Sequence, residues 1–267
     1  MNIILERPYA ISERGGRLNN EDSIYPLSEL ADSEQKLFIV CDGVGGAEKG
    51  EIASSLACES LQTFFATFLE GDPTKELITK AVQYTEVRFD EYVSQHPEAK
   101  GMATTMTLVY VGESGIIIAH IGDSRVYQFR DGQAIFQTED HSLVNSLVKL
   151  GKITADEAER HPQKNVITRA IQGTDSPVDA EIKLLTDIHP GDYFLMCTDG
   201  VTDCIRQETL SAVFLQAAST ESIKNIIVES CSVKARDNYS FYLIHIQDVQ
   251  NSSNYKQYIL SFLYTII

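Results

Sequence analysis

The chain has 267 residues, of which 43% are hydrophobic and 22% are charged, and these proportions are those of an ordinary globular protein. Its formal net charge of −16 excludes a nucleic-acid backbone or an anionic membrane as a partner, because like charges repel. A phosphate substrate would need cations between it and the protein. The five cysteines show no paired spacing, no secretion signal starts the chain, and no apolar stretch is long enough to span a bilayer. We therefore expect a cytoplasmic protein without a membrane span.

Apolar residues in the first half of the chain predict one strand, two helices and then a run of strands. An apolar stretch over residues 37–41 stops at Asp42 in a glycine-rich segment, which is typical of a buried strand entering a turn. Asp72-Pro73 is predicted to begin the second helix, and Asp131-Gly132 to form a two-residue hairpin turn. The expected helices cover residues 51–69 and 73–93, and the expected strands of an antiparallel meander cover 103–111, 115–121, 124–130 and 133–138.

The second half of the chain begins with a polar segment, residues 139–173, which we interpret as an exposed flap beside the active site that selects substrates. Thr154 to Glu157 has the pattern of a helix capping box within it. The elements expected after the flap are a strand at 193–198, helices at 208–217 and 221–231, and a strand at 241–247. This order favours sheet packed on sheet with helices outside, in one large domain.

Four aspartates lie where predicted strands begin or end. Asp42, Asp123 and Asp199 each follow an apolar run, and Asp237 lies just before the last strand. In antiparallel sheets the start of one strand lies beside the end of its neighbour, so all four are expected at one edge. A single Asp-Gly pair is more often a simple turn, but the combination favours a functional cluster.

Carboxylates gathered in one cleft raise each other's pKa values unless cations compensate their charge. A ligand set made only of oxygen favours Mg²⁺ or Mn²⁺ over Zn²⁺, and two such ions activate water as a bridging hydroxide. Gly43, directly after Asp42, lets the backbone come close enough for its carbonyl to be a ligand.

Five ordered motifs resemble those of the metal-dependent type 2C protein phosphatases, and the bacterial branch is the most similar. They are Arg17-Leu-Asn-Asn-Glu-Asp-Ser, Asp42-Gly-Val-Gly-Gly with Gly50-Glu51, Gly122-Asp-Ser-Arg, Cys197-Thr-Asp-Gly-Val-Thr-Asp, and Asp237-Asn238. The resemblance covers residues 11–247. It implies an α+β fold, a four-layer α-β-β-α sandwich, with a catalytic domain over residues 1–248 and an apolar tail over 249–267.

The resemblance also implies a role for each aspartate of the cluster. Asp42 corresponds to the carboxylate that bridges two core Mn²⁺ or Mg²⁺ ions. Asp199 and Asp237 correspond to ligands of the first ion, and the Gly43 carbonyl to a ligand of the second. Asp123 corresponds to the acid that holds a third ion together with Asp199.

Three residues before the first predicted strand complete the expected site. Asp22 corresponds to the residue that hydrogen-bonds metal-bound water, and Glu21 to one that reaches the second ion directly or through water. Arg17 corresponds to the arginine that binds phosphate, for which a guanidinium is suited by its paired donors. Many eukaryotic relatives carry a histidine where this chain has Val44, so the proton for the leaving group must come from elsewhere. We assign His141 no catalytic role, and Ser142 is expected to cap a helix.

The implied reaction is hydrolysis of phosphoserine and phosphothreonine in proteins by in-line attack of a metal-bridging hydroxide, without a phosphoenzyme. Phosphorylated proteins, together with a cognate serine/threonine kinase, are the expected partners. An aspartyl-phosphate mechanism would want a second acid at position 44, and a cysteine-based one would want an arginine six residues after a cysteine; the chain has neither. The remaining alternative is a pseudophosphatase, a binding or regulatory module that keeps the fold without the chemistry.

Overall fold

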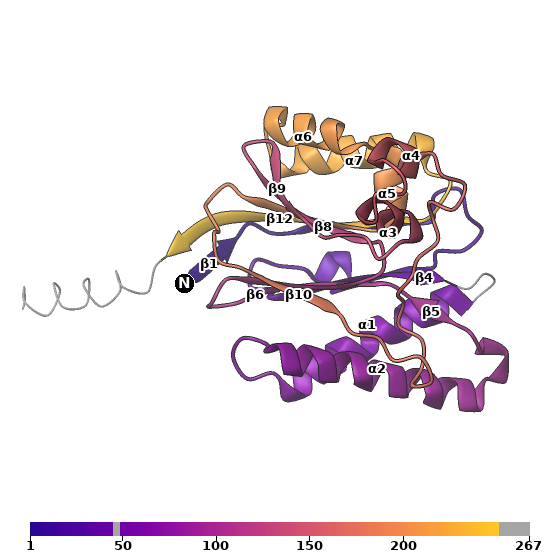
Figure 1. The fold of residues 1–267 in the computed structure, drawn as a ribbon. Coiled ribbons are helices and arrows are strands. Elements are labelled where there is room, and N and C mark those ends of the chain that lie inside the picture. The colour runs from indigo at the N-terminus through magenta and orange to yellow at the C-terminus, as the bar shows by residue number, and fades with distance from the viewer. Residues whose placement is uncertain (45–48, 251–267) are drawn as a thin grey trace, which may run out of the picture.

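Two antiparallel sheets of six strands lie face to face at the centre of the molecule (Figure 1). The computed structural model describes residues 1–44 and 49–250. The first sheet consists of β1 (Asn2–Leu5), β2 (Tyr9–Glu13), β8 (Arg125–Arg130), β9 (Gln133–Gln137), β11 (Tyr193–Cys197) and β12 (Tyr239–Gln250). The second consists of β3 (Asp22–Tyr25), β4 (Leu37–Val44), β5 (Ala103–Thr104), β6 (Met106–Val111), β7 (Ile116–Ile121) and β10 (Glu181–Leu185). Their orders are β1-β12-β11-β8-β9, with β2 also on β12, and β10-β7-β6-β4-β3, with β5 also on β4.

Helices cover the outer face of each sheet, which confirms the four-layer sandwich (Figure 1). The second sheet is covered by α1 (Lys49–Phe68) and α2 (Lys75–Gln95). The first is covered by α5 (Asp199–Cys204), α6 (Gln207–Gln216) and α7 (Thr220–Lys234). Two short 3-10 helices, η1 (Ser28–Leu30) and η2 (Pro97–Ala99), lie in connections.

Strand β4 shows why its sequence is a continuous apolar run. Phe38 and Val40 face the other sheet, whereas Ile39 and Cys41 face α1 and α2. Successive side chains of a strand point to opposite faces, so a strand with both faces covered must be apolar at every position. The apolar run is therefore typical of a strand inside the sandwich. Asp42 follows it, at the point where the strand leaves the core.

The predicted meander does not form a single sheet. Strands β6 and β7 belong to the second sheet, while β8 and β9 belong to the first. The chain crosses between the sheets at Gly122, whose φ is +100°, and Asp123 follows at this crossing. The hairpin turn is confirmed, because Asp131 and Gly132 both have positive φ.

Several local expectations are wrong. Thr74, not Asp72, caps α2 by accepting a hydrogen bond from the Leu77 amide, and Asp72 instead accepts from the amides of Glu113 and Ser114. The short helix α5, which begins at Asp199, was not predicted. The sequence also gave no indication of β1, β2, β3 and β10, which have four or five residues each.

The flap contains two short helices, α3 (Leu143–Lys149) and α4 (Ala155–Glu159), and the predicted capping box of Thr154 and Glu157 is present. The bridge of Ser142 with Ile167 joins the two ends of the flap to each other, and the bridge of Ile171 with Thr104 ties the flap to the second sheet. Strand β12 continues to Gln250, two residues beyond the expected domain boundary. The rest of the predicted tail, residues 251–267, lies outside the described residues.

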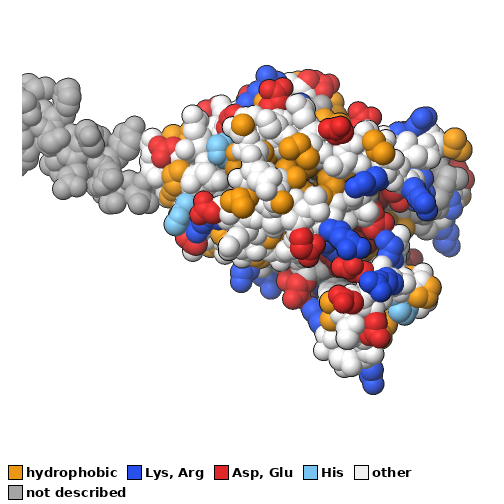
Figure 2. Space-filling model, turned by 90° about the horizontal axis from the view of Figure 1, so that it is seen from above, with side chains coloured by type: hydrophobic (Ala, Val, Ile, Leu, Met, Phe, Trp, Pro, Cys, Tyr) orange, Lys and Arg blue, Asp and Glu red, His pale blue; other side chains and the backbone are white. Residues whose placement is uncertain are grey.

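On the face drawn in Figure 2, acidic and basic side chains lie next to one another. No helix within residues 1–44 and 49–250 has the length and apolar character needed to cross a bilayer.

Candidate active site

Asp22 and Asp42 lie on neighbouring strands of the second sheet and are register partners across the β3–β4 pair. Thr105 fixes the backbone of Asp42 twice, since its hydroxyl accepts from the Asp42 amide at 2.9 Å and its amide donates to the Asp42 carbonyl at 2.9 Å. The Thr104 hydroxyl donates to the same carbonyl at 2.9 Å. Thr104 at the end of β5 and Thr105 between β5 and β6 thus hold Asp42 in place.

Asp199 and Asp237 come from the first sheet, at the end of β11 and just before β12. These strands are antiparallel neighbours, with Cys197 opposite Phe241, so the expected shared edge exists for this pair. The glycine after Asp199 is required by this contact: a Cβ on Gly200 would stand 1.9 Å from the carbonyl oxygen of Asn238. The helix start that carries Asp199 therefore lies directly against the backbone next to Asp237.

The two sheets meet at Asp22. Its Oδ2 accepts a hydrogen bond of 3.0 Å from the Thr198 hydroxyl, and that hydroxyl in turn accepts from the Ser240 amide at 3.0 Å. Burial raises the pKa of Asp22 to about 7, against the hydrogen bonds from Ser240 and Thr198, and the charges of Asp199 and Asp237 raise it further.

The electrostatics show that the aspartates form one group. Burial, and then the charges of Asp22, Asp199, Asp123 and Asp237, hold the pKa of Asp42 well above its usual value. Burial and the neighbouring acids raise the pKa of Asp199 to about 6 and that of Asp123 to about 7. Burial first, and then the charges of neighbouring acids, oppose ionisation of Asp22, Asp42, Asp123 and Asp199, which is the condition that a bound cation relieves.

The loop before β3 is fastened to this group by Asn238. The Asn238 side chain donates to the carbonyls of Arg14 and Asn19 at 2.7 Å each and accepts from the Glu21 amide at 2.8 Å. Arg17, on the same loop, donates to Asp237 Oδ2 at 2.6 Å, and its side chain remains 54% exposed. The loop thereby presents a half-exposed guanidinium beside the acidic group.

Gly43 and Gly50 bring β4, α1 and the Glu21 segment into close approach. A Cβ on Gly43 would stand 2.6 Å from the Glu21 carbonyl oxygen, and one on Gly50 would stand 2.8 Å from the Gly43 carbonyl oxygen. Burial, and then the charges of Asp237 and Glu51, raise the pKa of the Glu21 carboxyl against the opposing effect of Arg17. Val44, the residue in place of the eukaryotic histidine, is 37% exposed.

The sequence analysis did not anticipate two of the residues that shape this site. Thr198 was seen only as part of the Cys197-Thr-Asp-Gly motif, yet it connects Asp22 to the other sheet. His141 was given no role, yet its Nδ1 accepts from the Gly122 amide at 3.1 Å, beside Asp123. Within the described ranges, the group whose three candidate ligand atoms all lie within 4.8 Å of one another is His120, His141 and Glu181, not the aspartates.

A family model described as protein phosphatase 2C matches residues 12–229. The chain belongs to the protein phosphatase 2C family. This confirms the family resemblance and the reading of the chain as a protein phosphatase, and it gives the acidic group its context in a family of phosphatases.

Relatives in the 2C family include a putative protein phosphatase 2C-type of Streptococcus pyogenes serotype M6, 34% identical over 232 residues, which are 86% of this chain and 92% of the relative. The serine/threonine protein phosphatase PstP of Mycobacterium tuberculosis is 32% identical over 243 residues, and the match spans 90% of this chain but 45% of that longer protein.

Solved structures of the same family have the same fold. The crystal structure of Mycobacterium tuberculosis PstP/Ppp matches with a TM-score of 0.80 and 31% identity, over 92% of this chain and 100% of that one. The structure of the PstP catalytic domain in complex with two manganese ions matches with a TM-score of 0.77 and 31% identity over the same shares. A member of the family thus binds two manganese ions, and the donor set of this chain, buried carboxyls with raised pKa values, fits divalent cations.

Proposed function

We propose that this chain removes phosphate from phosphoserine and phosphothreonine in proteins, with Mn²⁺ or Mg²⁺ as its cofactor. The observation that carries the proposal is the group of carboxyls brought together from both sheets, Asp22, Asp42 and Asp199, whose pKa values are raised first by burial and then by the charges of neighbouring acids. A fold gains nothing from burying such charges together, so their convergence calls for a cation. Family membership and the serine/threonine protein phosphatase activity for which a relative is named support the same interpretation.

In this proposal Asp42 holds two core ions, Asp199 and Asp237 hold the first, and the Gly43 carbonyl and Glu21 serve the second. A third ion would be held by Asp123 with Asp199. When bound, the ions supply an activated water and neutralise charge on the phosphoryl group. The tight approach of Gly43 to Gly50 supports the role of its carbonyl, because a side chain at either position would fill that space.

The chain's own residues bind and orient the substrate. Arg17 donates to Asp237 through one nitrogen only, and a guanidinium has five N–H donors, so its exposed part can bind phosphate oxygens. The Asp237 contact fixes the direction of the Arg17 side chain. Asp22, held between the sheets by Thr198, would accept a hydrogen bond from water in the site.

Replacement of Asp199 by asparagine tests the proposal. Asp199→Asn keeps the shape of the side chain but removes its charge, and we expect turnover of p-nitrophenyl phosphate with Mn²⁺ to fall by about 10²–10³-fold or more. The matched control is Asp156→Asn, in the exposed first turn of α4, which should keep full activity. Near-normal turnover by the Asp199→Asn protein would contradict the metal role.

Metal titration of the wild-type protein tests the pseudophosphatase alternative. Titration calorimetry with Mn²⁺ and with Mg²⁺, run beside the turnover assay, distinguishes a chain that binds ions and hydrolyses from one that binds ions alone. Comparing the turnover with Mn²⁺ and with Mg²⁺ would also show which of the two ions the enzyme prefers. The cognate kinase, the protein substrates and a cytoplasmic location remain predictions from the sequence.

A further inference from the structure

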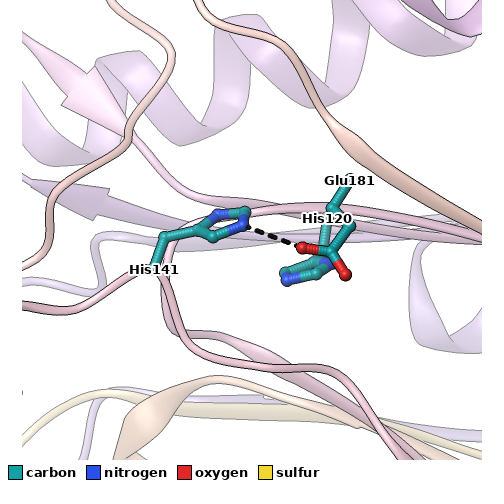
Figure 3. Close-up of side chains that lie close together, drawn as sticks. All are labelled: His120, His141 and Glu181. Carbon is teal, nitrogen blue, oxygen red and sulfur yellow. Dashed lines mark ion pairs between the residues drawn. The ribbon is translucent and has the colours of Figure 1, made fainter. Parts of the chain in front are cut away.

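His120, His141 and Glu181 lie close together (Figure 3). His120 and Glu181 are register partners on β7 and β10, and His141 reaches them from the start of the flap. The two imidazole rings stack with centroids 4.5 Å apart, and His141 Nε2 lies 3.5 Å from Glu181 Oε2. Both histidines are buried, whereas the Glu181 side chain is 56% exposed.

The spacing of these side chains suggests a transition-metal site, but their hydrogen bonds oppose it. In the neutral tautomer that accepts the Gly122 amide at Nδ1, the proton is on Nε2, which is the atom that would have to bind the metal. Moving that proton to Nδ1 would set two N–H groups against each other. Arg169 Nη1 also lies 3.3 Å from Nε2, and a guanidinium there repels a cation.

The same hydrogen bonds describe a clamp on the residue before Asp123. Gly122 and His141 are joined twice: the Gly122 amide donates to His141 Nδ1 at 3.1 Å, and the His141 amide donates to the Gly122 carbonyl at 2.9 Å. Gly122 has φ of +100° at the crossing between the sheets, where no β-ladder fixes the backbone. These two hydrogen bonds therefore hold the Gly122 backbone where strand pairing does not, and the Gly122 backbone sets the direction of the Asp123 side chain.

Neighbouring contacts hold the clamp itself in place. Arg125 makes a bidentate pair with Asp140, at 2.7 and 2.6 Å, so the residue before His141 is tied to the residue two after Asp123. The His141 carbonyl accepts from the Thr168 amide at 2.7 Å, which connects the clamp to the far end of the flap. His141, at the start of the flap, is thus connected both to the residue before Asp123 and to the end of the flap.

We propose that His141 is a positioning residue for Asp123, and that its Nδ1 holds the Gly122 amide so that the Asp123 carboxylate faces Asp42 and Asp199. This inference rests on the proposed function, because it gives Asp123 a cation to hold. The group is not catalytic, since His141 acts on Asp123 through the Gly122 backbone. Groups that orient metal ligands in this indirect way typically change metal affinity or activity by about 10–100-fold when they are removed.

Substitution of His141 by asparagine and by glutamine distinguishes the role of Nδ1 from that of Nε2. His141→Asn places an acceptor near the position of Nδ1, while His141→Gln places its amide near Nε2 and leaves the Gly122 amide without a partner. His141→Leu removes both, and Asp123→Asn serves as the reference for loss of the carboxylate. In the metal-free proteins, NMR hydrogen exchange of the Gly122 amide should stay slow in His141→Asn and become about 10-fold faster or more in His141→Gln.

The same proteins are then titrated with Mn²⁺ and assayed on p-nitrophenyl phosphate. We expect the wild-type and His141→Asn proteins to bind an additional ion that is weaker than the core ions. His141→Gln and His141→Leu should bind this ion about 10-fold less tightly, and Asp123→Asn should not bind it. The affinity for the tighter ions should be the same in all five proteins. The turnover number should fall in the variants that bind this weaker ion less tightly, and their KM should change little.

Wild-type protein that neither binds Mn²⁺ nor turns over would refute the proposed function. With an active wild type, equal exchange and equal Mn²⁺ binding in the asparagine and glutamine proteins would refute the clamp alone. An Asp123→Asn protein that still binds every ion would also overturn it. If the leucine protein does not fold, the comparison of asparagine with glutamine still decides.

Discussion

Gly200→Ala sets two physical effects of opposite sign against each other. Gly200 lies in the first turn of α5 and has no positive φ, so alanine would ordinarily stabilise the helix by about 0.5–1 kcal/mol. In this structure the new Cβ would stand 1.9 Å from the Asn238 oxygen, 2.9 Å from its carbonyl carbon and 3.3 Å from Tyr239 Cα. All three are backbone atoms, so no side chain can rotate away.

The start of α5 and the start of β12 must separate by about 1 Å to relieve this overlap, which costs roughly 1–3 kcal/mol and outweighs the helical gain. For a domain of this size we expect the melting temperature to fall by about 2–8 °C. The shift also moves Asp199 away from Asp237 and disturbs the Asn238 side chain that holds Glu21, so turnover should fall by about 10²-fold.

Thermal unfolding by circular dichroism and turnover of p-nitrophenyl phosphate with Mn²⁺ measure the two effects. The control is Gly101→Ala, whose Cβ would meet no atom within 4 Å but whose φ is +86°; the left-handed backbone conformation should cost an alanine there about 1–2 kcal/mol of stability while activity stays normal. A Gly200→Ala protein that melts at a higher temperature with unchanged turnover would show that this close approach is not needed.

Three further predictions concern the supports of the site and of the fold. Asn238→Ala removes the hydrogen-bond partner of the Glu21 amide and one donor from each of the Arg14 and Asn19 carbonyls, and should lower the free energy of unfolding by about 1–3 kcal/mol in urea titrations; an unchanged midpoint would refute this. Arg125→Lys loses the bidentate pair with Asp140 and should lower the melting temperature measurably, whereas an unchanged value would show the pair to be neutral. The pKa of Glu6 is lowered from its usual 4.5, chiefly by the Thr220 hydrogen bond, so its ionised form stabilises the fold above pH 4.5 and this gain is lost as pH falls through the lower folded value. The stability difference between wild type and Glu6→Gln should therefore shrink below about pH 4.5, and a difference that grows there would reverse the argument.

Signals within a short stretch of chain determined much of this protein. The apolar run before Asp42 predicted a strand buried on both faces, and Asp131-Gly132 predicted a hairpin turn, because periodicity and turn chemistry depend on neighbours in sequence. The ordered motifs identified the family, and Asp42 and Asp199 share one electrostatic group as expected from their places after strands. Strands β3 and β10 are short and mix polar or charged residues with apolar ones, so neither shows the apolar run that marked β4 and neither was predicted.

The tertiary structure alone decided how these pieces meet. The run of strands around Asp123 looks like one meander, but it divides between two sheets, since a turn does not record which sheet the next strand will join. Thr198 and Asp22 are 176 residues apart and touch because the sheets stack at that point. The contact of His141 with Gly122 likewise depends on where the crossing brings the flap. Local chemistry specifies elements, whereas contacts between sheets follow from packing the whole core, which no short stretch of sequence encodes.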